Sequence, residues 1–233
     1  MRQLTNSLFF TLGALLGSQV KLRFDNYQQP RPMPHQWGRL LDHPLRLRYR
    51  QPVETLTDLG FAPAMTVLDL GCGTGLFTVA MAQMVGEEGR VHAVEMQKPL
   101  LGQAQARAQA LGLQARIHFH HCGAYQLPIE TSSIDLAVVI ATLSQIPNKA
   151  AALTELRRVL KPGARLAISE ELPDPAYIPP QAMRHWLANA GYTFMAQSGN
   201  FFCYTQLYIP DKEPNTVDVT PEIISVDSKT VRQ

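Results

Sequence analysis

The sequence has few cysteines and few charged residues. It contains three cysteines, Cys72, Cys122 and Cys203, and none of them form a Cys-x-x-Cys pair. Their odd number and wide spacing argue against a disulfide framework and indicate reduced thiols in a cytoplasmic protein. With 233 residues, of which 45% are hydrophobic, the chain is long enough to bury one sizeable core.

Charge of either sign is scarce, but it is unevenly distributed. Charged residues make up 17% of the chain and the formal net charge is +2. Residues 1–50 carry eight basic and two acidic side chains, which leaves a net charge of −4 for the remainder. This asymmetry predicts an anionic partner for the first fifth of the chain. It also argues against a basic groove for nucleic acid on the rest.

The sequence also lacks a long hydrophobic run. Residues 3–20 are uncharged, but the run is short for a membrane span and is interrupted by polar residues such as Thr5 and Asn6. No Ala-x-Ala cleavage site follows it. Three interpretations stay open: a helix that packs on the next domain as a lid, an anchor on an anionic membrane surface through residues 1–50, or a span. A span would place the following domain in the cytoplasm, because basic residues follow it.

Apolar and amphipathic segments alternate through most of the chain. The predicted strands are apolar on both faces, which is typical of a parallel sheet covered by helices. The predicted strands cover residues 65–70, 90–95, 115–120, 134–140 and 164–170, and the predicted helices cover residues 76–85, 98–111 and 148–160. This order indicates an α/β fold with a Rossmann-like, doubly wound sheet.

The end of the α/β series departs from this alternation. After a helix that stops at Gly191, two strand-like runs flank Ser-Gly-Asn, which predicts an antiparallel hairpin. Residues 25–37, rich in Pro and Gln, are expected to form an irregular connector. The expected divisions are an N-terminal lid or anchor over residues 1–44, a catalytic domain over 45–210 and a polar, flexible tail over 211–233.

Glycine alternates with other residues where the first strand meets its helix. Gly71, Gly73 and Gly75 form a loop in which a ligand can approach the backbone closely, next to a helix N-terminus. Leu76 stands where the last glycine of a dinucleotide-binding Gly-x-Gly-x-x-Gly motif would be. The loop is therefore expected to hold a ligand other than a dinucleotide.

Two carboxylates accompany this loop. Asp69 precedes it directly and favours a positively charged group nearby. Glu95 ends the second strand, 20 residues after Gly75, where a carboxylate can accept hydrogen bonds from both hydroxyls of a ribose. Together these residues predict a site for a nucleoside that carries a cationic, amino-acid-like tail.

Three stretches carry a resemblance to a known family. They are VLDLGCGTG at 67–75, VHAVEM at 91–96 and LKPGARLAISE at 160–170. They resemble the class I S-adenosylmethionine-dependent methyltransferases, and more narrowly the methyltransferase-11 and quinone-biosynthesis-like group of small-molecule enzymes. The resemblance implies a mostly parallel, seven-stranded sheet that ends in the antiparallel hairpin, and S-adenosyl-L-methionine as the cofactor.

The resemblance also implies which residues bind the cofactor. Asp69 and the glycines hold its methionine part, Glu95 its ribose, and Met96 lies against its adenine. Gly123 stands where the family commonly has an aspartate that contacts the adenine amino group, so that contact either comes from backbone or Tyr125 or is absent. The implied cofactor-binding residues are Asp69, Gly71, Cys72, Gly73, Gly75, Glu95, Met96, Gly123, Ala124, Ala141 and Thr142.

Methyl transfer requires alignment of the acceptor and exclusion of water more than it requires reactive side chains. A base is needed only where the acceptor must lose a proton early. Glu170 and Glu171 end the fifth strand, where ligands bind in such sheets, and are the catalytic candidates; the alternative is that they are solvated loop carboxylates. No metal is expected, and the HFHHC stretch at 118–122 is interpreted as ordinary third-strand residues.

The predicted function is methyl transfer to a small, hydrophobic acceptor such as a quinone, a lipid or a polyketide-like molecule. The stretch ATLSQIPN stands where methyltransferases of nucleic-acid base amines carry [Asp/Asn]-Pro-Pro-[Tyr/Phe], which argues against that class. One alternative is a cofactor-binding scaffold or sensor at a membrane that transfers no methyl group. The other is an RNA methyltransferase that uses the basic N-terminal arm.

Overall fold

The computed structural model describes residues 17–211. The interpretations of residues 1–16 and of the tail beyond residue 211 therefore lie outside the described part of the chain. Within it, a seven-stranded sheet has the order β3-β2-β1-β4-β5-β7-β6. Its strands are β1 (Thr66–Leu70), β2 (Arg90–Val94), β3 (Ile117–His120), β4 (Ile134–Ile140), β5 (Leu160–Glu171), β6 (Tyr192–Gly199) and β7 (Cys203–Pro210).

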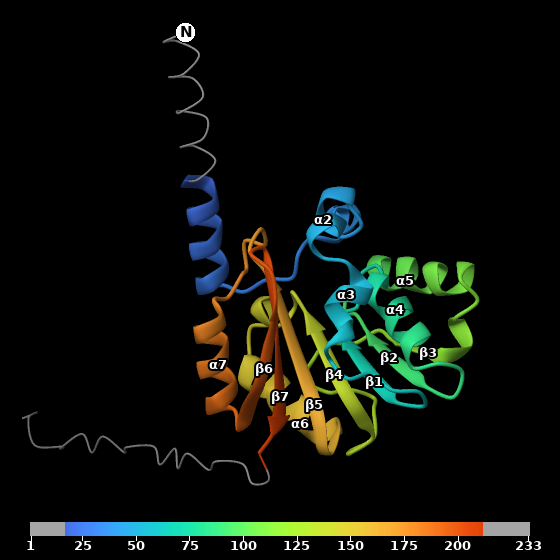
Figure 1. Cartoon of the computed structure of the whole chain (residues 1–233). Helices are drawn as coiled ribbons and strands as arrows, with labels where there is room; N and C mark the ends of the chain where they lie inside the picture. The colour runs from blue at the N-terminus through green and yellow to red at the C-terminus, as the bar shows by residue number, and fades with distance from the viewer. Residues whose placement is uncertain (1–16, 212–233) are drawn as a thin grey trace, which may run out of the picture.

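The direction of the strands confirms the predicted fold class. Strands β1 to β5 are parallel, whereas β7 runs antiparallel to both β5 and β6. The hairpin thus extends the sheet beyond β5, with β7 between β5 and β6 (Figure 1). The sheet is accordingly a mostly parallel α/β sheet that ends in an antiparallel hairpin.

Helices cover both faces of the sheet. The helices are α2 (Pro44–Tyr49), α3 (Pro52–Thr57), α4 (Leu76–Met84), α5 (Lys98–Ala110), α6 (Lys149–Val159) and α7 (Pro180–Asn189), and the shorter 3-10 turns are η1 (His35–Leu40), η2 (Gln114–Arg116) and η3 (Leu143–Gln145). One buried apolar cluster joins α6 and α7 to one face, and a second joins α3, α4 and α5 to the other. Strands that are apolar on both faces are buried by this arrangement.

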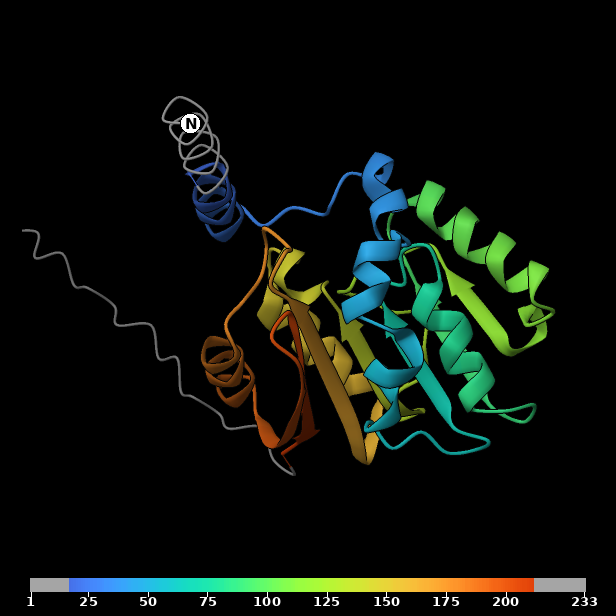
Figure 2. The same cartoon turned by 45° about the horizontal axis from the view of Figure 1, so that its top comes forward.

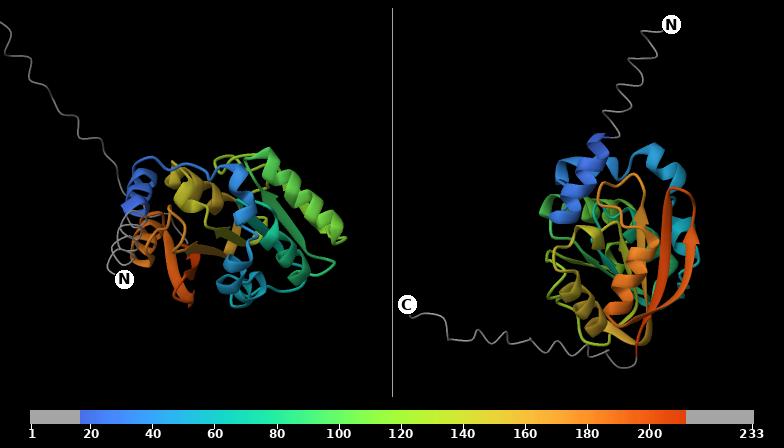
Figure 3. Two further views of the ribbon diagram at one scale, coloured as in Figure 1. Left: turned by 90° about the horizontal axis from the view of Figure 1, so that it is seen from above. Right: turned by 90° about the vertical axis from the view of Figure 1, so that its left-hand side faces the viewer.

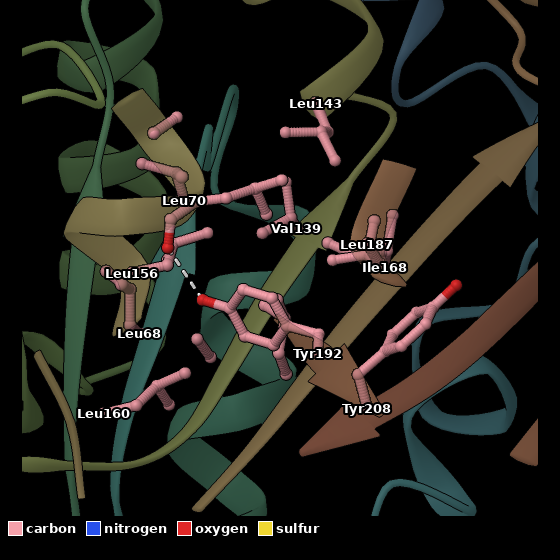
Figure 4. Close-up of a cluster of buried hydrophobic side chains, with 14 of the residues drawn as sticks. Leu68, Leu70, Val139, Leu143, Leu156, Leu160, Ile168, Leu187, Tyr192 and Tyr208 are labelled. Atoms are coloured by element: carbon pink, nitrogen blue, oxygen red, sulfur yellow. Dashed lines mark hydrogen bonds between the residues drawn. The ribbon is translucent and has the colours of Figure 1, made fainter. Parts of the chain in front are cut away.

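The cluster beneath α6 and α7 shows how the hairpin is attached (Figure 4). The ring of Tyr192 at the start of β6 is buried there, and its hydroxyl donates a hydrogen bond to the carbonyl of Leu153 in α6 at 2.8 Å. Leu68, Val139 and Ile168 from three neighbouring strands lie in the same cluster. The C-terminal hairpin therefore shares the core of the parallel sheet.

The N-terminal part differs from its predicted outline. A helix covers residues 17–28, so the expected irregular connector begins only after it, because Pro30 disfavours helical backbone at the residue before it. The helix stands beyond the carboxyl edge of the parallel strands, while β7 ends at the opposite edge (Figures 1 and 3). From this helix the chain crosses above the sheet to η1 and α2 (Figure 2).

Strand β5 also begins earlier than predicted. Leu160 already pairs with Ile134 of β4, and the register shifts before Arg165 pairs with Leu136. Pro162 and Gly163 lie within this irregular stretch, and Gly163 has a φ of 77°. A proline cannot donate a hydrogen bond to the sheet, so it is accommodated where the regular pairing is interrupted.

Candidate functional site

The glycine loop connects the ends of three parallel strands. The N–H groups of Gly71 and Cys72 both donate to the carbonyl of Val94 at the end of β2, at 2.8 and 3.0 Å. Gly71 has a φ of 81°, and a Cβ at this position would lie 2.3 Å from the Oγ1 atom of Thr142, just after β4. A side chain at Gly71 would thus separate the loop from the end of β4.

The next two glycines allow close approach of other segments. A Cβ at Gly73 would lie 3.0 Å from the side chain of Leu41, in the chain that crosses the site. A Cβ at Gly75 would lie 2.8 Å from the Cα of Ala104 in α5. Gly75 therefore permits α4 to begin in direct contact with α5, whereas Gly73 faces the crossing segment.

Asp69 is buried at the end of β1. Asp69 is only 2% exposed, and its Oδ2 atom accepts a hydrogen bond from the Thr78 hydroxyl at 2.6 Å. The pKa of Asp69 is raised to about 7, chiefly by burial; the Thr78 hydrogen bond lowers this pKa and the charge of Glu95 raises it. A cation bound beside the loop would stabilise its ionised form.

Glu95 lies at the end of β2 and holds the loop directly. Its Oε2 accepts a hydrogen bond from the Gly73 N–H at 3.1 Å, and its Oε1 accepts one from the Gln97 N–H at 2.8 Å. Burial raises the pKa of Glu95, while these backbone N–H groups lower it. A carboxylate has about four lone-pair positions, so Glu95 retains capacity to accept hydrogen bonds from a diol.

The residues predicted to surround the adenine are more open. Met96 is 55% exposed, and its carbonyl lies 3.0 Å from the Nε2 atom of His121. Gly123 is exposed, with open space where a Cβ would be, and Ala124 is half-buried. Tyr125, which could replace the missing aspartate contact, accepts a hydrogen bond from the Asn148 N–H at 3.1 Å.

The end of β4 has a strained backbone. Ala141 has a φ of 47°, which is uncommon outside glycine and clusters at functional sites. Its N–H donates to the carbonyl of Ser169 in β5 at 2.7 Å, and its carbonyl accepts from the Gln145 side chain at 2.9 Å. The Thr142 hydroxyl bonds to the Ile140 carbonyl at 2.9 Å. These contacts hold the ends of β4 and β5 together beside the glycine loop.

Glu171 is held in a buried ion pair. Its two carboxylate oxygens lie 3.0 and 3.1 Å from the Nε atom of Arg46 in α2, and Oε2 lies 3.9 Å from the Nε atom of Arg50. The Tyr49 hydroxyl lies 3.4 Å from Oε2, and burial, followed by the charge of Glu171, raises the pKa of Tyr49 to about 12. Glu171 thus connects β5 to α2.

Glu170 points to the other face of the same strand. It is fully buried, and neither of its carboxylate oxygens has a hydrogen-bond partner among the described residues. Burial, followed by the charge of Asp174, raises the pKa of Glu170 well above its usual range. The structure therefore gives these two adjacent carboxyl groups different surroundings, and neither is a solvated loop residue.

The chain between helix 17–28 and α2 crosses the site as a strap, defined here as residues 33–42. The Met33 N–H donates to the Gln145 side chain at 2.8 Å, and the Gln97 side chain donates to the Met33 carbonyl at 2.9 Å. Asp42 forms an ion pair with Arg107 of α5 at 2.6 Å. The strap therefore joins the ends of β2 and β4 across the candidate site. It belongs to residues 1–44, for which the sequence left a lid or a membrane anchor open.

Two basic residues have a different role from the one that their position in the sequence suggested. Arg46 and Arg50 belong to the basic N-terminal part that was expected to face an anionic partner, but they are 9% and 0% exposed. Arg46 donates to Glu171, 125 residues away along the chain. Arg50 donates to the Ser169 hydroxyl and to the Glu170 carbonyl, with its Nε atom 3.9 Å from Glu171. For these two arginines the expectation is wrong, because a buried carboxylate compensates their charge.

The histidine-rich stretch lies at the sheet edge. His92 Nδ1 lies 2.9 Å from His120 Nε2, and the rings of His92 and His118 stack with centroids 5.3 Å apart. Burial, followed by the charges of its two neighbours, lowers the pKa of His92 to about 4. Among residues 17–211, no group of three or more His, Cys, Asp or Glu side chains is placed to hold a metal ion.

The residues at the glycine loop fit the cofactor implied by the sequence. The glycines keep the loop free of side chains and let Thr142, Leu41 and Ala104 approach its backbone. Asp69 offers a buried carboxyl to a cation, and Glu95 can accept hydrogen bonds from a ribose. Of the implied binding residues, the structure brings Asp69, the loop, Glu95, Ala141 and Thr142 together. It leaves Met96 and Gly123 at the exposed side.

Comparison with known proteins gives a consistent result. Residues 62–200 match a family described as a methyltransferase domain, which is more than half of the chain. The chain is 37% identical over 128 residues to a demethylmenaquinone methyltransferase from Lactiplantibacillus plantarum, covering 54% of each protein. It is 38% identical over 109 residues to a 2-phytyl-1,4-naphtoquinone methyltransferase from Trichormus variabilis, covering 47% of this chain and 48% of that protein. The chain thus matches about half the length of these curated relatives.

The solved structures agree with the fold. A SAM-dependent methyltransferase from Aquifex aeolicus superposes with a TM-score of 0.71 at 25% identity, over 76% of this chain and 98% of that one. A geranyl diphosphate C-methyltransferase from Streptomyces coelicolor, solved with S-adenosyl-L-homocysteine, superposes with a TM-score of 0.57 at 15% identity, over 68% and 76% of the two chains. The latter similarity concerns the fold alone.

Proposed function

Since the chain belongs to the methyltransferase domain family, we propose that it transfers the methyl group of S-adenosyl-L-methionine to a small, apolar acceptor of the quinone class. The observation that carries this proposal is the arrangement of Glu95 and Asp69 around the glycine loop. The names of the two quinone-related relatives support the class of acceptor.

The chain's own residues bind and orient the reactants. Glu95 holds the ribose hydroxyls of the cofactor while it fixes Gly73, and Asp69 attracts the cationic methionine part. When bound, the cofactor supplies an electrophilic methyl group on a sulfonium. The strap at residues 33–42 excludes water from the loop, which strengthens these electrostatic interactions.

The acceptor enters where β4 and β5 end, beyond Thr142. Glu170 and Glu171 are the catalytic candidates there. Because Arg46 and Arg50 compensate the charge of Glu171, we assign that residue to holding α2 in place and Glu170 to contact with the acceptor. The catalytic roles of both residues stay predictions.

A membrane surface supplies the acceptor in this proposal. Helix 17–28 exposes apolar side chains, among them Phe24 at 62% and Tyr27 at 74%, and the basic Lys21 is exposed on the same helix. Arg23 instead packs over the ring of Tyr177 and donates to the carbonyl of Leu172. Phe201, at the turn of the β6–β7 hairpin, is 81% exposed. Within residues 17–211 no helix is long and apolar enough to cross a bilayer. Apolar and basic side chains together suit the surface of an anionic membrane.

Calorimetric titration with S-adenosyl-L-methionine tests the cofactor site. We expect micromolar binding by the wild-type chain and about 100-fold weaker binding by Glu95→Ala, because the ribose would lose its hydrogen bonds to the carboxylate and the Gly73 N–H would lose its acceptor. Glu88→Ala, at an exposed position far from the loop, serves as the control. Methyl transfer from radiolabelled cofactor to 1,4-dihydroxynaphthalene then tests the activity. Binding of the cofactor without transfer to any quinol or lipid acceptor would favour the scaffold alternative.

Cosedimentation with vesicles tests the membrane. We expect the full chain to bind phosphatidylglycerol vesicles, and the double variant Phe24→Asp/Phe201→Asp to bind about tenfold more weakly, since each phenylalanine loses its apolar burial in lipid. Leu111→Asp, which changes a 54% exposed leucine at the far end of α5, is the matched control. Equal binding by all three chains would contradict the proposed membrane surface.

A further inference from the structure

Two buried polar side chains lie side by side at the end of β5. Their contact with each other favours the ionised form of Glu170 but falls short of a hydrogen bond of regular geometry. Glu170 is 0% exposed and Ser144 in η3 is 5% exposed. Among the described residues, neither oxygen of Glu170 nor the hydroxyl of Ser144 has a hydrogen-bond partner. Buried polar groups without partners are rare and destabilise the folded state, so each one requires an explanation.

The polar groups around Glu170 are already engaged elsewhere. Tyr204, which pairs with Glu170 in the sheet, donates its hydroxyl to the carbonyl of Ile178 at 2.7 Å. The ammonium group of Lys149 donates to the carbonyl of Ile146 at 3.0 Å. Tyr204 and Lys149 therefore leave the carboxyl group of Glu170 available. Arg50 donates to the Ser169 hydroxyl and to the Glu170 main-chain carbonyl, and its Nε atom also has no hydrogen-bond partner among the described residues.

The charges that act on Glu170 also differ from those that act on Glu171. Burial disfavours its ionised form most, and the charges of Asp174 and Glu171 add to this effect, whereas Arg50 and the contact with Ser144 favour the ionised form. The pKa of the carboxyl group therefore lies well above its usual range. In its protonated form the group offers one hydrogen-bond donor and an acceptor, and Ser144 offers the same combination.

The position of the pair relates it to the cofactor site. Ser144 follows Thr142 by two residues, and the Thr142 side chain lies against Gly71 of the glycine loop. The rings of Tyr177 and Tyr204, with centroids 6.0 Å apart, lie near Glu170 and provide apolar surface. A ligand in contact with the pair would thus lie beside the loop and against aromatic rings.

We propose that the Glu170 carboxyl and the Ser144 hydroxyl bind one hydroxyl group of an otherwise apolar, aromatic acceptor. The acceptor hydroxyl donates to one of these groups and accepts from the other, which satisfies both buried side chains. This inference rests on the proposed function, because it presupposes an apolar acceptor next to the cofactor.

Two probes of nearly equal size test the subsite. Equilibrium dialysis measures the affinity of the full chain for 1-naphthol and for 1-methylnaphthalene, with S-adenosyl-L-homocysteine present. We expect the wild type to prefer 1-naphthol by about tenfold, the factor that corresponds to one or two well-made neutral hydrogen bonds. Glu170→Leu and Ser144→Ala should reduce this preference by weakening 1-naphthol alone. Glu170→Gln, which keeps a donor and an acceptor, should retain it, as should the control Glu88→Gln.

The unfolding temperature shows whether Glu170→Leu loses affinity because the variant is less stable. Because Glu170→Leu replaces an unpartnered carboxyl by an apolar side chain, the variant should unfold at a higher temperature than the wild type. Equal affinity of the wild type for the two probes would overturn the subsite but leave the apolar acceptor in place. The subsite would also be overturned if Glu170→Leu lowered the affinity for 1-naphthol and for 1-methylnaphthalene by the same factor. Failure of the wild type to bind either probe, with the cofactor site loaded, would refute the aromatic acceptor itself and the subsite with it.

Discussion

The two halves of the site are built in different ways. At the ends of β1 and β2, the glycine loop and Glu95 lie within 30 residues of one another and are joined by backbone hydrogen bonds. At the ends of β4 and β5, side chains from α2, η3 and β5 meet, and the closest ion pair joins residues 125 positions apart. The first half depends on backbone shape and the second on buried charge, so substitutions in the two halves should affect different properties.

The largest effect on stability should come from a substitution in the half of the site at the ends of β4 and β5. Glu171→Gln leaves Arg46 and Arg50 buried without a counter-charge and should lower the free energy of unfolding by about 3 kcal/mol, measured by urea denaturation. Cofactor affinity, corrected for the unfolded fraction, should change little. A strong loss of cofactor affinity by folded Glu171→Gln would erase the distinction between the two halves.

A substitution in the loop should affect binding first. Gly71→Ala places a Cβ against Thr142 at a φ of 81° and should abolish detectable cofactor binding, with a loss of about 2 kcal/mol in stability. Gly86→Ala is the matched control, because Gly86 has a similar φ of 73° but open space around its Cβ. If the two variants bound the cofactor equally well, contact with Thr142 would not matter for the loop.

The raised pKa of Asp69 predicts opposite effects of pH on stability and on cofactor affinity. Its raised pKa, about 7 in the folded chain, means that its contribution to stability is complete below about pH 4 and is lost as the pH rises through 7. Cofactor affinity should move the other way and increase by up to about tenfold per pH unit towards pH 7, because the cationic ligand binds the ionised form.

Calorimetry at several pH values measures this coupling. Asp69→Asn should flatten the pH dependence, except for the part due to Glu95, whose pKa burial also raises. An unchanged pH dependence in Asp69→Asn would assign the titration to another group. Asp58→Asn, at an exposed position, should behave as the wild type does.

The smallest effect on stability should come from a substitution in the strap at residues 33–42. Asp42→Asn weakens a partly exposed ion pair with Arg107 and should lower stability by less than about 1 kcal/mol. Because the strap spans both halves of the site, the rate of cofactor dissociation should rise more than stability falls, and added salt should reproduce the effect in the wild type. Dissociation rates that are equal in the two chains would show that this ion pair does not hold the strap closed.

Local sequence was sufficient for much of the fold and for one half of the site. The alternation of apolar and amphipathic segments predicted five parallel strands and the hairpin, because residues near in sequence form each element. The glycine spacing and the two carboxylates predicted the loop for the same reason, since Asp69 lies near the end of strand β1 before Gly71, and Glu95 directly follows the adjacent strand β2.

The other half depended on contacts between distant segments. Glu170 and Glu171 are neighbours in the sequence and look alike there, but a strand points them to opposite faces, one towards two arginines and one towards Ser144. The crossing of the strap over the loop likewise joins Met33 to Gln97 and Gln145. The sequence pattern does not indicate these contacts between distant residues, because they form only when the packed sheet brings its strand ends together.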